Sequence, residues 1–237
     1  MQEIIENNRA IWVDPQLLGT DRARDAFDAG FWQAQSAIIG SAQGRGTTWF
    51  VRGAQCDMAL RHYRRGGLFG KIVSDSYWFT GWEQTRSYQE MHILQRLVDG
   101  GVNVPRPVAA QAVRSGLTYQ ADILVEKIND SEDLVGLLQR QPIEAERWNQ
   151  IGQMIRRMHD LQVCHTDLNA HNILLDAQQQ VWLIDFDKCY QQQGESWKAK
   201  NLARLKRSFS KEVGRCNIHW QEADWQLLCQ GYDTAAV

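Results

Sequence analysis

The stretch that decides the fold is HTDLNAHNILL, at residues 165–175, together with IDFD at residues 184–187. Mg²⁺ takes oxygen ligands, so the amide oxygen of Asn172 and the carboxylate of Asp185 are candidate metal ligands. A second carboxylate, Asp167, can orient a hydroxyl and accept its proton. The alternative interpretation is two solvated loops whose acids are there by chance. An amide oxygen and a carboxylate that can hold Mg²⁺ against phosphates, beside a second carboxylate for the acceptor, suit phosphoryl transfer.

These two segments resemble the HxDxxxxN catalytic loop and the DFG metal loop of the protein-kinase fold. The resemblance implies that Asp167 is the catalytic residue, and that Asn172 and Asp185 hold Mg²⁺ beside ATP. The chain departs from the pattern at Thr166, where the loop has Arg, and at Asp187, where DFG has Gly. No APE motif follows. We therefore expect no activation segment and no protein substrate, which favours a small or glycolipid acceptor.

Upstream, residues 32–63 alternate short apolar or β-branched runs with glycines, which predicts three strands joined by tight turns. Apolar residues recur at helical spacing over residues 82–98, and two glycines follow, which predicts a helix and its end. Two further strand-like runs flank Arg114-Ser115-Gly116 and predict a hairpin. The first half is therefore expected to form a five-stranded antiparallel sheet with one helix.

Beyond Glu126 the pattern becomes mainly helical. An amphipathic helix is predicted from the spacing of Trp148, Ile151, Met154, Ile155, Met158 and Leu161. Two short strands flank the polar turn at residues 177–180, and helical spacing returns from there to the C-terminus. The prediction is an α+β, protein-kinase-like fold of two lobes. Residues 1–125 form the nucleotide-binding N-lobe, and residues 126–237 form a mainly helical C-lobe with the catalytic and metal loops and the acceptor site.

A glycine-containing turn, GSAQGRG at residues 40–46, is expected between the first two strands. Backbone N–H groups of such a turn can approach phosphates, although glycine-rich hairpins are also common for structural reasons. The segment departs from the GxGxxG pattern because Trp49 stands where the third glycine would be.

The third strand carries MALR at residues 58–61, which resembles the VAIK motif with Arg61 in the lysine position. Strand alternation puts Ala59 and Arg61 on one face. Lys71 is a second candidate for the phosphate-binding cation, and Glu90 is the expected ion-pair partner, although a lone glutamate is as often solvated. The candidate nucleotide-binding residues are therefore Gly44, Gly46, Ala59, Arg61, Glu90 and Glu126.

Composition excludes several other classes of protein. The net charge of −2 predicts no general affinity for nucleic acid. Five scattered cysteines without a CxxC pair argue against a disulfide framework or a structural zinc site. No secretory signal or membrane-spanning run is recognisable. Ten tryptophans are explained by core packing, with membrane interfaces and sugar faces as the alternative.

The motifs GRGTTWFVRG, LRHYRRGGLFGK, HTDLNAHNILLD, VWLIDFDK and NLARLKRSFSK together resemble the lipopolysaccharide kinase family over residues 30–215. That resemblance implies a kinase-like fold that uses ATP and Mg²⁺. It also implies transfer of the γ-phosphate to the 4-hydroxyl of 3-deoxy-D-manno-octulosonic acid (Kdo) on a lipid A precursor. This reaction belongs to lipopolysaccharide core biosynthesis, at the cytoplasmic face of the inner membrane, where the protein would be peripheral.

Other small-molecule kinases of this fold remain alternatives, namely a lipopolysaccharide heptose kinase or an aminoglycoside- or choline-type phosphotransferase. The RHYRRGG stretch favours the lipopolysaccharide group. A pseudokinase binding module is motivated by the imperfect glycine turn and the missing strand lysine. The three intact polar residues Asp167, Asn172 and Asp185 argue against it.

A basic segment over residues 197–215 raises the question of partners. Its apolar residues Trp197, Leu202, Leu205, Phe209 and Val213 recur at helical spacing, which predicts a helix packed on the core. Its cations are Lys198, Lys200, Arg204, Lys206, Arg207, Lys211 and Arg215, against the single acid Glu212. We expect this face to meet an anionic membrane surface or the acidic groups of a Kdo-bearing lipid A precursor. No nucleic-acid partner is expected.

Overall fold

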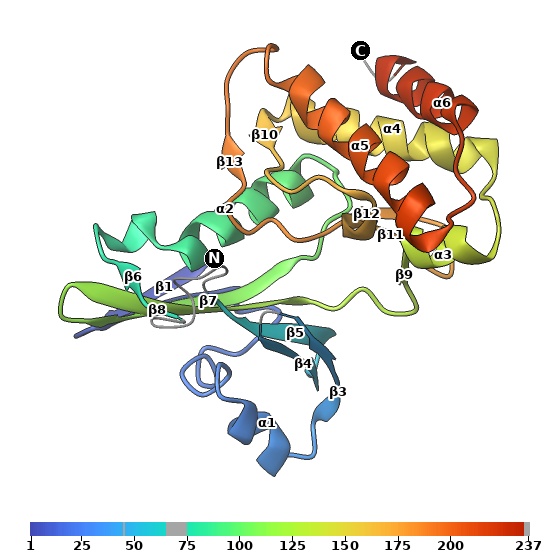
Figure 1. Ribbon diagram of the computed structural model, residues 1–237. Helices are drawn as coiled ribbons and strands as arrows, with labels where there is room; N and C mark the ends of the chain where they lie inside the picture. The colour runs from blue at the N-terminus through green and yellow to red at the C-terminus, as the bar shows by residue number, and fades with distance from the viewer. Residues whose placement is uncertain (45, 65–74, 235–237) are drawn as a thin grey trace. The chain divides into compact units, whose positions relative to one another are not determined.

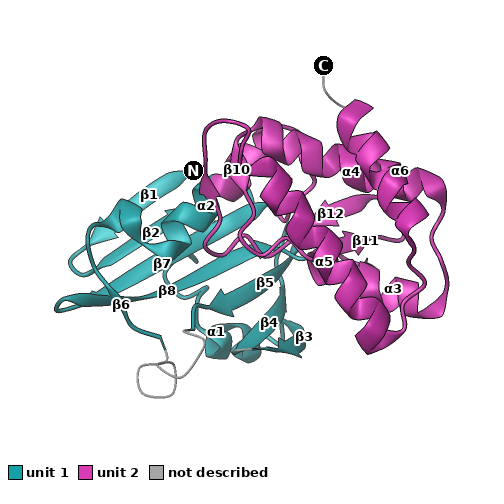
Figure 2. Ribbon diagram, turned by 45° about the horizontal axis from the view of Figure 1, so that its top comes forward, with its two compact units in different colours: residues 1–92, 106–127 teal, residues 93–105, 128–237 magenta. Residues whose placement is uncertain are grey.

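The computed structural model describes residues 1–44, 46–64 and 75–234 of the chain. It forms two compact units, shown in Figure 2. Unit 1 comprises residues 1–92 and 106–127, and unit 2 comprises residues 93–105 and 128–237. The prediction from the sequence is one lobe that contains all of residues 1–125. Residues 93–105 belong to unit 2 instead. Asn103 shows why, because its carbonyl accepts from the Leu183 N–H at 2.9 Å and its Nδ2 donates to the Val181 carbonyl at 3.0 Å.

Unit 1 is built on an antiparallel sheet with the strand order β1-β2-β7-β8-β5-β4-β3, in which β6 also pairs with β8 (Figure 1). The strands are β1 (Gln2–Glu6), β2 (Arg9–Val13), β3 (Ile38–Gln43), β4 (Thr47–Arg52), β5 (Asp57–His62), β6 (Tyr77–Trp78), β7 (Pro107–Ser115) and β8 (Thr118–Glu126). The predicted strands are β3, β4, β5, β7 and β8. The prediction of five strands was wrong because β1, β2 and β6 join the same sheet.

The N-terminal hairpin explains most of that difference. Asn7 has a φ of 50°, in the left-handed region that asparagine tolerates, so the chain can reverse between β1 and β2. β2 then pairs along its whole length with β7. The polar pair Asn7-Asn8 between two alternating runs is the sequence signal that indicates this hairpin.

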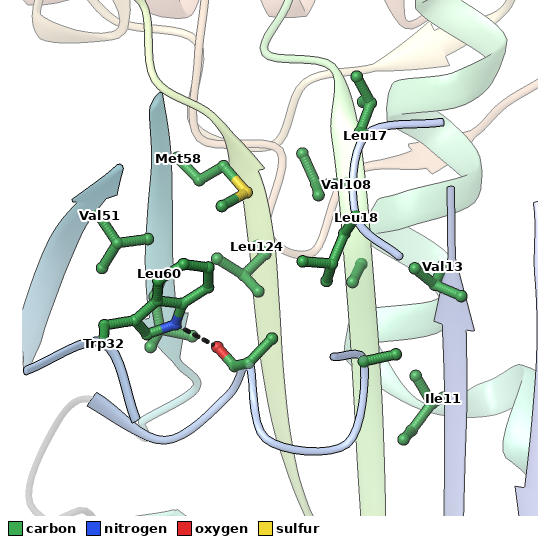
Figure 3. Close-up of a cluster of buried hydrophobic side chains, with 13 residues drawn as sticks. Ile11, Val13, Leu17, Leu18, Trp32, Val51, Met58, Leu60, Val108 and Leu124 are labelled. Carbon is green, nitrogen blue, oxygen red and sulfur yellow. Dashed lines mark hydrogen bonds between the residues drawn. The ribbon is translucent and has the colours of Figure 1, made fainter. Parts of the chain in front are cut away.

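One core of unit 1 is a buried hydrophobic cluster to which α1 (Ala29–Ala34) contributes Trp32 (Figure 3). The indole Nε1 of Trp32 donates to the Ala26 carbonyl at 2.8 Å, which satisfies its buried polar atom. Met58 and Leu60 of β5 point into this core. α1 was not predicted, so unit 1 holds more helix than the single one expected.

The long predicted helix is α2 (Arg86–Asp99), preceded by the 3₁₀ turn η2 (Trp82–Gln84). Its end matches the glycine signal, since Gly101 has a φ of 72°. The predicted hairpin between β7 and β8 is confirmed, and Gly116 at its turn also has a positive φ of 59°.

Unit 2 is mainly helical, as predicted. Its helices are α3 (Leu134–Arg140), α4 (Ala145–Asp160), α5 (Lys198–Cys216) and α6 (Glu222–Thr234). The unit also contains the 3₁₀ turn η3 (Ala170–Asn172), between α4 and α5. Two small sheets complete the unit, with the orders β12-β11-β9 and β10-β13. Their strands are β9 (Glu132–Asp133), β10 (Val163–Cys164), β11 (Ile173–Leu175), β12 (Val181–Leu183) and β13 (Tyr190–Gln191).

Helices α4 and α6 pack so closely that glycine is required on both. A Cβ atom on Gly152 would lie 2.0 Å from the Leu228 carbonyl oxygen, and one on Gly231 would lie 2.0 Å from that of Asn149. This contact brings Tyr232 of α6 against α4, where it takes part in the network described below.

Helix α5 buries Leu205 and Phe209, as the apolar stripe predicts. The same prediction was wrong for Val213, which is exposed, whereas Glu212 beside it is buried. The reason is that the inward face of α5 also carries polar residues that contact the loop at residues 165–172.

All five cysteines are free thiols. Among the residues described, no helix is long and apolar enough to cross a membrane.

Candidate active site

The loop at residues 165–172 resembles the catalytic loop of kinases and is called the catalytic loop below for that resemblance. Its first histidine holds it in place. The His165 Nε2 donates to the Ile184 carbonyl at 2.9 Å, and its Nδ1 accepts from the Asp167 N–H at 3.2 Å. One ring nitrogen therefore carries a proton and the other does not, so the imidazole is neutral. Burial lowers the pKa of His165, which agrees with that state. The buried ring links the loop to the chain that leads into Asp185.

The candidate metal ligands lie on segments that are hydrogen-bonded to each other. Asn172 Nδ2 donates to the Asp167 carbonyl at 2.9 Å, and the Ile184 N–H donates to the Asn172 carbonyl at 3.1 Å. Asp185 follows with a φ of 63°, a left-handed conformation that is costly for a residue with a side chain. The structure therefore brings the segments of Asp167, Asn172 and Asp185 together within unit 2.

The donor set of this site fits Mg²⁺. Because the Asn172 amide nitrogen is used by the Asp167 carbonyl, the amide oxygen is the atom available to a cation. Asp185 adds a carboxylate, and hard oxygen ligands with few protein donors are typical of Mg²⁺ bound together with substrate phosphates. The described part of the chain contains no cluster of three or more His, Cys, Asp or Glu that could hold a metal ion, so a separate all-protein metal cage is absent there.

A chain of buried hydrogen bonds connects α6, α4 and α5 to the catalytic loop. Tyr232 OH donates to His159 Nδ1 at 2.8 Å, His159 Nε2 donates to Asn201 Oδ1 at 3.0 Å, and Asn201 Nδ2 donates to the His165 carbonyl at 2.7 Å. Burial lowers the pKa of His159 to about 4, so the ring is neutral at pH 7. Burial also raises the pKa of Tyr232 to about 12. These contacts join three helices, and no sequence pattern indicated them.

The side chain of Asp167 forms an ion pair with Arg204 of α5. Both side chains are about half exposed, at 46% for Asp167 and 47% for Arg204. Burial raises the pKa of Asp167, but the hydrogen bond and charge of Arg204 outweigh this, so its pKa lies below the ordinary value. From the sequence, Arg204 is only one of the surface cations of the basic segment, because no spacing rule joins it to Asp167, which lies far back along the chain.

Unit 1 contains the predicted pair between Arg61 and Glu90, with NH2 of Arg61 2.5 Å from Oε1 of Glu90. Glu90 is 4% exposed, and its other carboxylate oxygen accepts from Tyr63 OH at 2.5 Å. The Arg61 guanidinium also lies over the Tyr63 ring, 5.2 Å from its centroid. Tyr63 was not predicted, although it stands two residues after Arg61, on the same face of the chain.

The other candidate nucleotide residues lie on the same sheet. Ala59 shares a face of β5 with Arg61, opposite to the core residues Met58 and Leu60, as predicted. Glu126 ends β8, and its carboxylate lies 3.6 Å from Arg106 Nε. Lys71, the alternative cation, lies outside the described residues.

The glycine turn is shorter than predicted. Gly40 belongs to β3, where the pairing with β4 shifts between Ile38 and Gly40, so the strand runs on to Gln43. The turn therefore begins only after Gln43, where the Gly44 N–H donates to the Gly46 carbonyl at 3.0 Å. The expectation of a turn from Gly40 onward was wrong because the strand pairing continues through it.

The basic face of α5 is smaller than the sequence indicated. Lys198 is buried and contacts Glu195 at 2.8 Å, and Lys206 contacts Glu222 at 2.5 Å. These two lysines therefore form ion pairs with acidic residues of unit 2. Lys200, Arg207 and Lys211 remain exposed on one side of the helix, together with Arg204 and Arg215.

Known proteins match this chain along nearly its whole length. The model of the Lipopolysaccharide kinase (Kdo/WaaP) family matches residues 29–232. A 3-deoxy-D-manno-octulosonic acid kinase of Photobacterium profundum is 62% identical over 98% of both chains. The kinase of the same name from Vibrio cholerae is 57% identical over 93% of both chains, and that from Haemophilus influenzae is 54% identical over 90% of this chain and 91% of the relative. With its kinase-like α+β architecture and a catalytic loop that presents Asp167, the chain belongs to the lipopolysaccharide kinase (Kdo/WaaP) family and is a phosphotransferase that acts on a hydroxyl group.

Proposed function

We propose that the protein transfers the γ-phosphate of ATP to the 4-hydroxyl of Kdo on a lipid A precursor, in lipopolysaccharide core biosynthesis. The carrying observation is the catalytic loop, in which Asp167 and Asn172 are hydrogen-bonded to each other and tied to the segment of Asp185. Relatives named as Kdo kinases, at 52–62% identity over most of the chain, support the choice of sugar. ATP is the phosphate donor that kinase chemistry implies.

In this proposal Asp167 acts on the acceptor. The carboxylate accepts the proton of the acceptor hydroxyl while the hydroxyl oxygen forms a bond to the γ-phosphorus. The bond between that phosphorus and the β–γ bridging oxygen breaks, and its electron pair leaves with ADP. The Asp167 backbone is fixed by two hydrogen bonds, from its N–H to His165 and from Asn172 to its carbonyl. This positions the residue that carries the carboxylate before the acceptor binds.

Asn172 and Asp185 are the residues that would hold Mg²⁺. Bound Mg²⁺ supplies neutralisation of the phosphate charge that develops during transfer. Asn172 would contribute its amide oxygen and Asp185 its carboxylate, while the hydrogen bond from Ile184 to Asn172 keeps the two segments in register.

For the nucleotide, we propose that Arg61 contacts the phosphates as the lysine of the VAIK motif does in protein kinases. Glu90 and Tyr63 orient its guanidinium from one side. Gly44 and Gly46 would let the backbone of the turn approach the phosphates, with the Gly46 N–H as the donor because the Gly44 N–H already bonds the Gly46 carbonyl. Ala59 and Glu126 would lie beside the nucleotide. Arginine presents a planar fork to phosphate oxygens, so it is a competent substitute for lysine.

The acceptor is a lipid, and we propose that α5 docks the protein to the anionic cytoplasmic face of the inner membrane. Lys200, Arg207 and Lys211 are exposed along one side of this helix. Cations near an anionic surface contribute about 1 kcal/mol each. The variant Arg207→Glu plus Lys211→Glu should lower co-sedimentation with phosphatidylglycerol vesicles while leaving the ATP KM unchanged. Arg22→Glu plus Arg157→Glu changes the net charge equally at exposed sites elsewhere and should bind like the parent; equal loss in both variants would contradict docking by α5.

The activity is tested with purified protein, ATP, Mg²⁺ and one of two acceptors: a Kdo-bearing lipid A precursor or its heptosylated counterpart. Mass spectrometry should show addition of one phosphate to the first acceptor, and proton–phosphorus correlation NMR should place it on the 4-oxygen. Asp167→Asn serves as the inactive control. Phosphate found only on heptose would identify a heptose kinase, and nucleotide binding without any product would favour the pseudokinase alternative.

A further inference from the structure

Helix α5 presents a line of polar side chains to the catalytic loop. Their positions are spaced by three or four residues, so they share one side of the helix. The contacts run in order along the loop: Asn201 with the His165 carbonyl, Arg204 with the Asp167 carboxylate, Ser208 Oγ with the Ala170 N–H, and Glu212 with His171. One side of α5 therefore holds the catalytic loop in place along the length of the loop.

Arg204 differs from the other members of this line. Asn201 and Glu212 are buried and Ser208 is half-buried, whereas Arg204 is exposed and its partner is equally exposed. The structure records one contact of its guanidinium, from NH2 to Oδ1 of Asp167, among the described residues. A guanidinium has five N–H donors, so most of its hydrogen-bonding capacity is open to a second anion.

The energy of this pair allows an exchange of partners. An exposed ion pair contributes little to stability, because both groups are already well solvated. A carboxylate from another molecule, presented to the open side of the fork, can therefore bind Arg204 at little cost. Other cations lie on the same side of α5, namely Lys200, Arg207, Lys211 and Arg215, so the local potential favours an anionic ligand.

Geometry restricts where such an anion can come from. The hydroxyl that loses its proton must lie within hydrogen-bond distance of Asp167, which places it within one side chain of Arg204. In the proposed acceptor the sugar is itself an acid, and its carboxylate is attached to the same ring as the reacting 4-hydroxyl, two carbons away. The acid and the hydroxyl of one sugar can therefore contact Arg204 and Asp167 together.

We propose that Arg204 is the acceptor-recognition residue of this enzyme: it binds the carboxylate of the sugar and in doing so releases Asp167 to the hydroxyl. The inference rests on the proposed function, because it needs an acidic sugar as acceptor. It assigns to Arg204 both the choice of acid sugars over neutral ones and the placement of the hydroxyl on Asp167.

The test compares the Kdo-bearing acceptor with its C1 carboxamide, which has the same shape without the charge. The parent should prefer the acid in kcat/KM by about 10- to 100-fold, the range of a charge-assisted hydrogen bond. Arg204→Gln should lose that preference through a lower kcat/KM for the acid alone, with the ATP KM unchanged. Arg204→Lys, which keeps the charge without the fork, should keep part of it.

Arg140→Gln is the matched control, since Arg140 forms an exposed pair with Glu132 in the same unit, at 60% and 39% exposure. It should retain the full preference for the acid. Should Arg204→Gln fail to fold, as judged by its melting curve, Arg204→Lys carries the same comparison. A third acceptor that lacks the lipid phosphates distinguishes the source of the anion: if the Arg204 effect disappears with the phosphates rather than with the carboxylate, the inference is overturned.

Two failures are distinguishable. If the parent phosphorylates the acid and the amide equally well, Arg204 does not read the carboxylate, although the proposed function stands. If the parent phosphorylates neither acceptor, the proposed function is wrong and this inference falls with it.

Discussion

Two arginine–carboxylate pairs, one in each unit, use the same chemistry in different surroundings. In unit 1, Glu90 is almost fully buried and receives both Arg61 and the Tyr63 hydroxyl. In unit 2, Asp167 and Arg204 are both about half exposed. A buried carboxylate with several donors is fixed, because moving it would leave charge without compensation. An exposed pair is exchangeable, which suits a carboxylate that must release one partner and accept another.

The largest expected effect separates the two carboxylates by function. Asp167→Asn should lower the single-turnover rate by about 10²- to 10⁴-fold, the usual contribution of a general base, while nucleotide binding persists. Glu90→Gln should retain the catalytic base and lose stability instead. Turnover of Asp167→Asn at the parent rate would show that Asp167 is not the base. The two ion pairs would then differ in burial but not in catalytic function.

A buried group whose hydrogen-bond partners are neutral, His159, extends the comparison to pH. Burial lowers the pKa of His159 to about 4, so the unfolded chain binds a proton near pH 6.5 that the folded protein refuses until about pH 4. Stability should therefore fall as the pH drops from 6.5 to 4, by up to about 3 kcal/mol, and this loss should be absent above pH 6.5.

Urea unfolding of the parent and of His159→Gln at several pH values measures this effect. The variant cannot titrate at this position, so its stability should depend less on pH over that interval. Some dependence should remain, because the pKa of His165 is also lowered by burial. Parallel curves for the two proteins would contradict the assignment to His159.

Breaking the buried pair should have an intermediate effect. Arg61→Ala removes one charged partner of a buried carboxylate, and we expect the free energy of unfolding to fall by about 1–3 kcal/mol. If Arg61 also contacts the phosphates, the ATP KM should rise more than the acceptor KM. Arg61→Lys is the conservative control. A rise in ATP KM with Lys71→Ala alone would move the phosphate contact to that residue and leave Arg61 a structural role.

The smallest effect on stability is expected at the exposed pair. Arg204→Ala should change the free energy of unfolding by less than about 1 kcal/mol, and 1 M NaCl should reduce the difference further, because exposed charges are screened. Urea titration of the parent and variant at low and high salt measures both. A loss as large as that of Arg61→Ala would mean that the pair is structural, and that it does not exchange partners readily.

Parts of the site were predictable because their signals are local. Asp167, Asn172 and Asp185 stand close together in the sequence, and the turn between β11 and β12 brings their segments into hydrogen-bond contact. The pairing of Arg61 with Glu90 was also predictable, through the position of each in a kinase-like pattern. Arg204, Tyr232 and Asn201 were not, because each reaches its partner across dozens of residues and has no spacing rule that reveals it.

The same distinction applies to the fold. Alternation and turn residues determined β3, β4, β5, β7 and β8, because strand periodicity is written in consecutive residues. Whether a further hairpin joins that sheet depends on which edge is open, and β1 and β2 join it beside β7. The face that a helix buries is likewise decided by its neighbours, so α5 buries Glu212 and exposes Val213.

The sequence by itself determined the reaction class and most of the strands, and it indicated the loop at residues 165–172 as the candidate site, since these depend on residue types at short spacings. Only the tertiary structure decided that Arg204 pairs with Asp167 and that Tyr63 donates to Glu90. It also decided that Lys198 and Lys206 form ion pairs with acidic residues, which reduces the exposed basic face of α5. The physical reason is that the position of a charged residue in the sequence does not determine its ion-pair partner. Its partner is chosen by distance and solvent exposure, and both arise only when the helices and loops pack together.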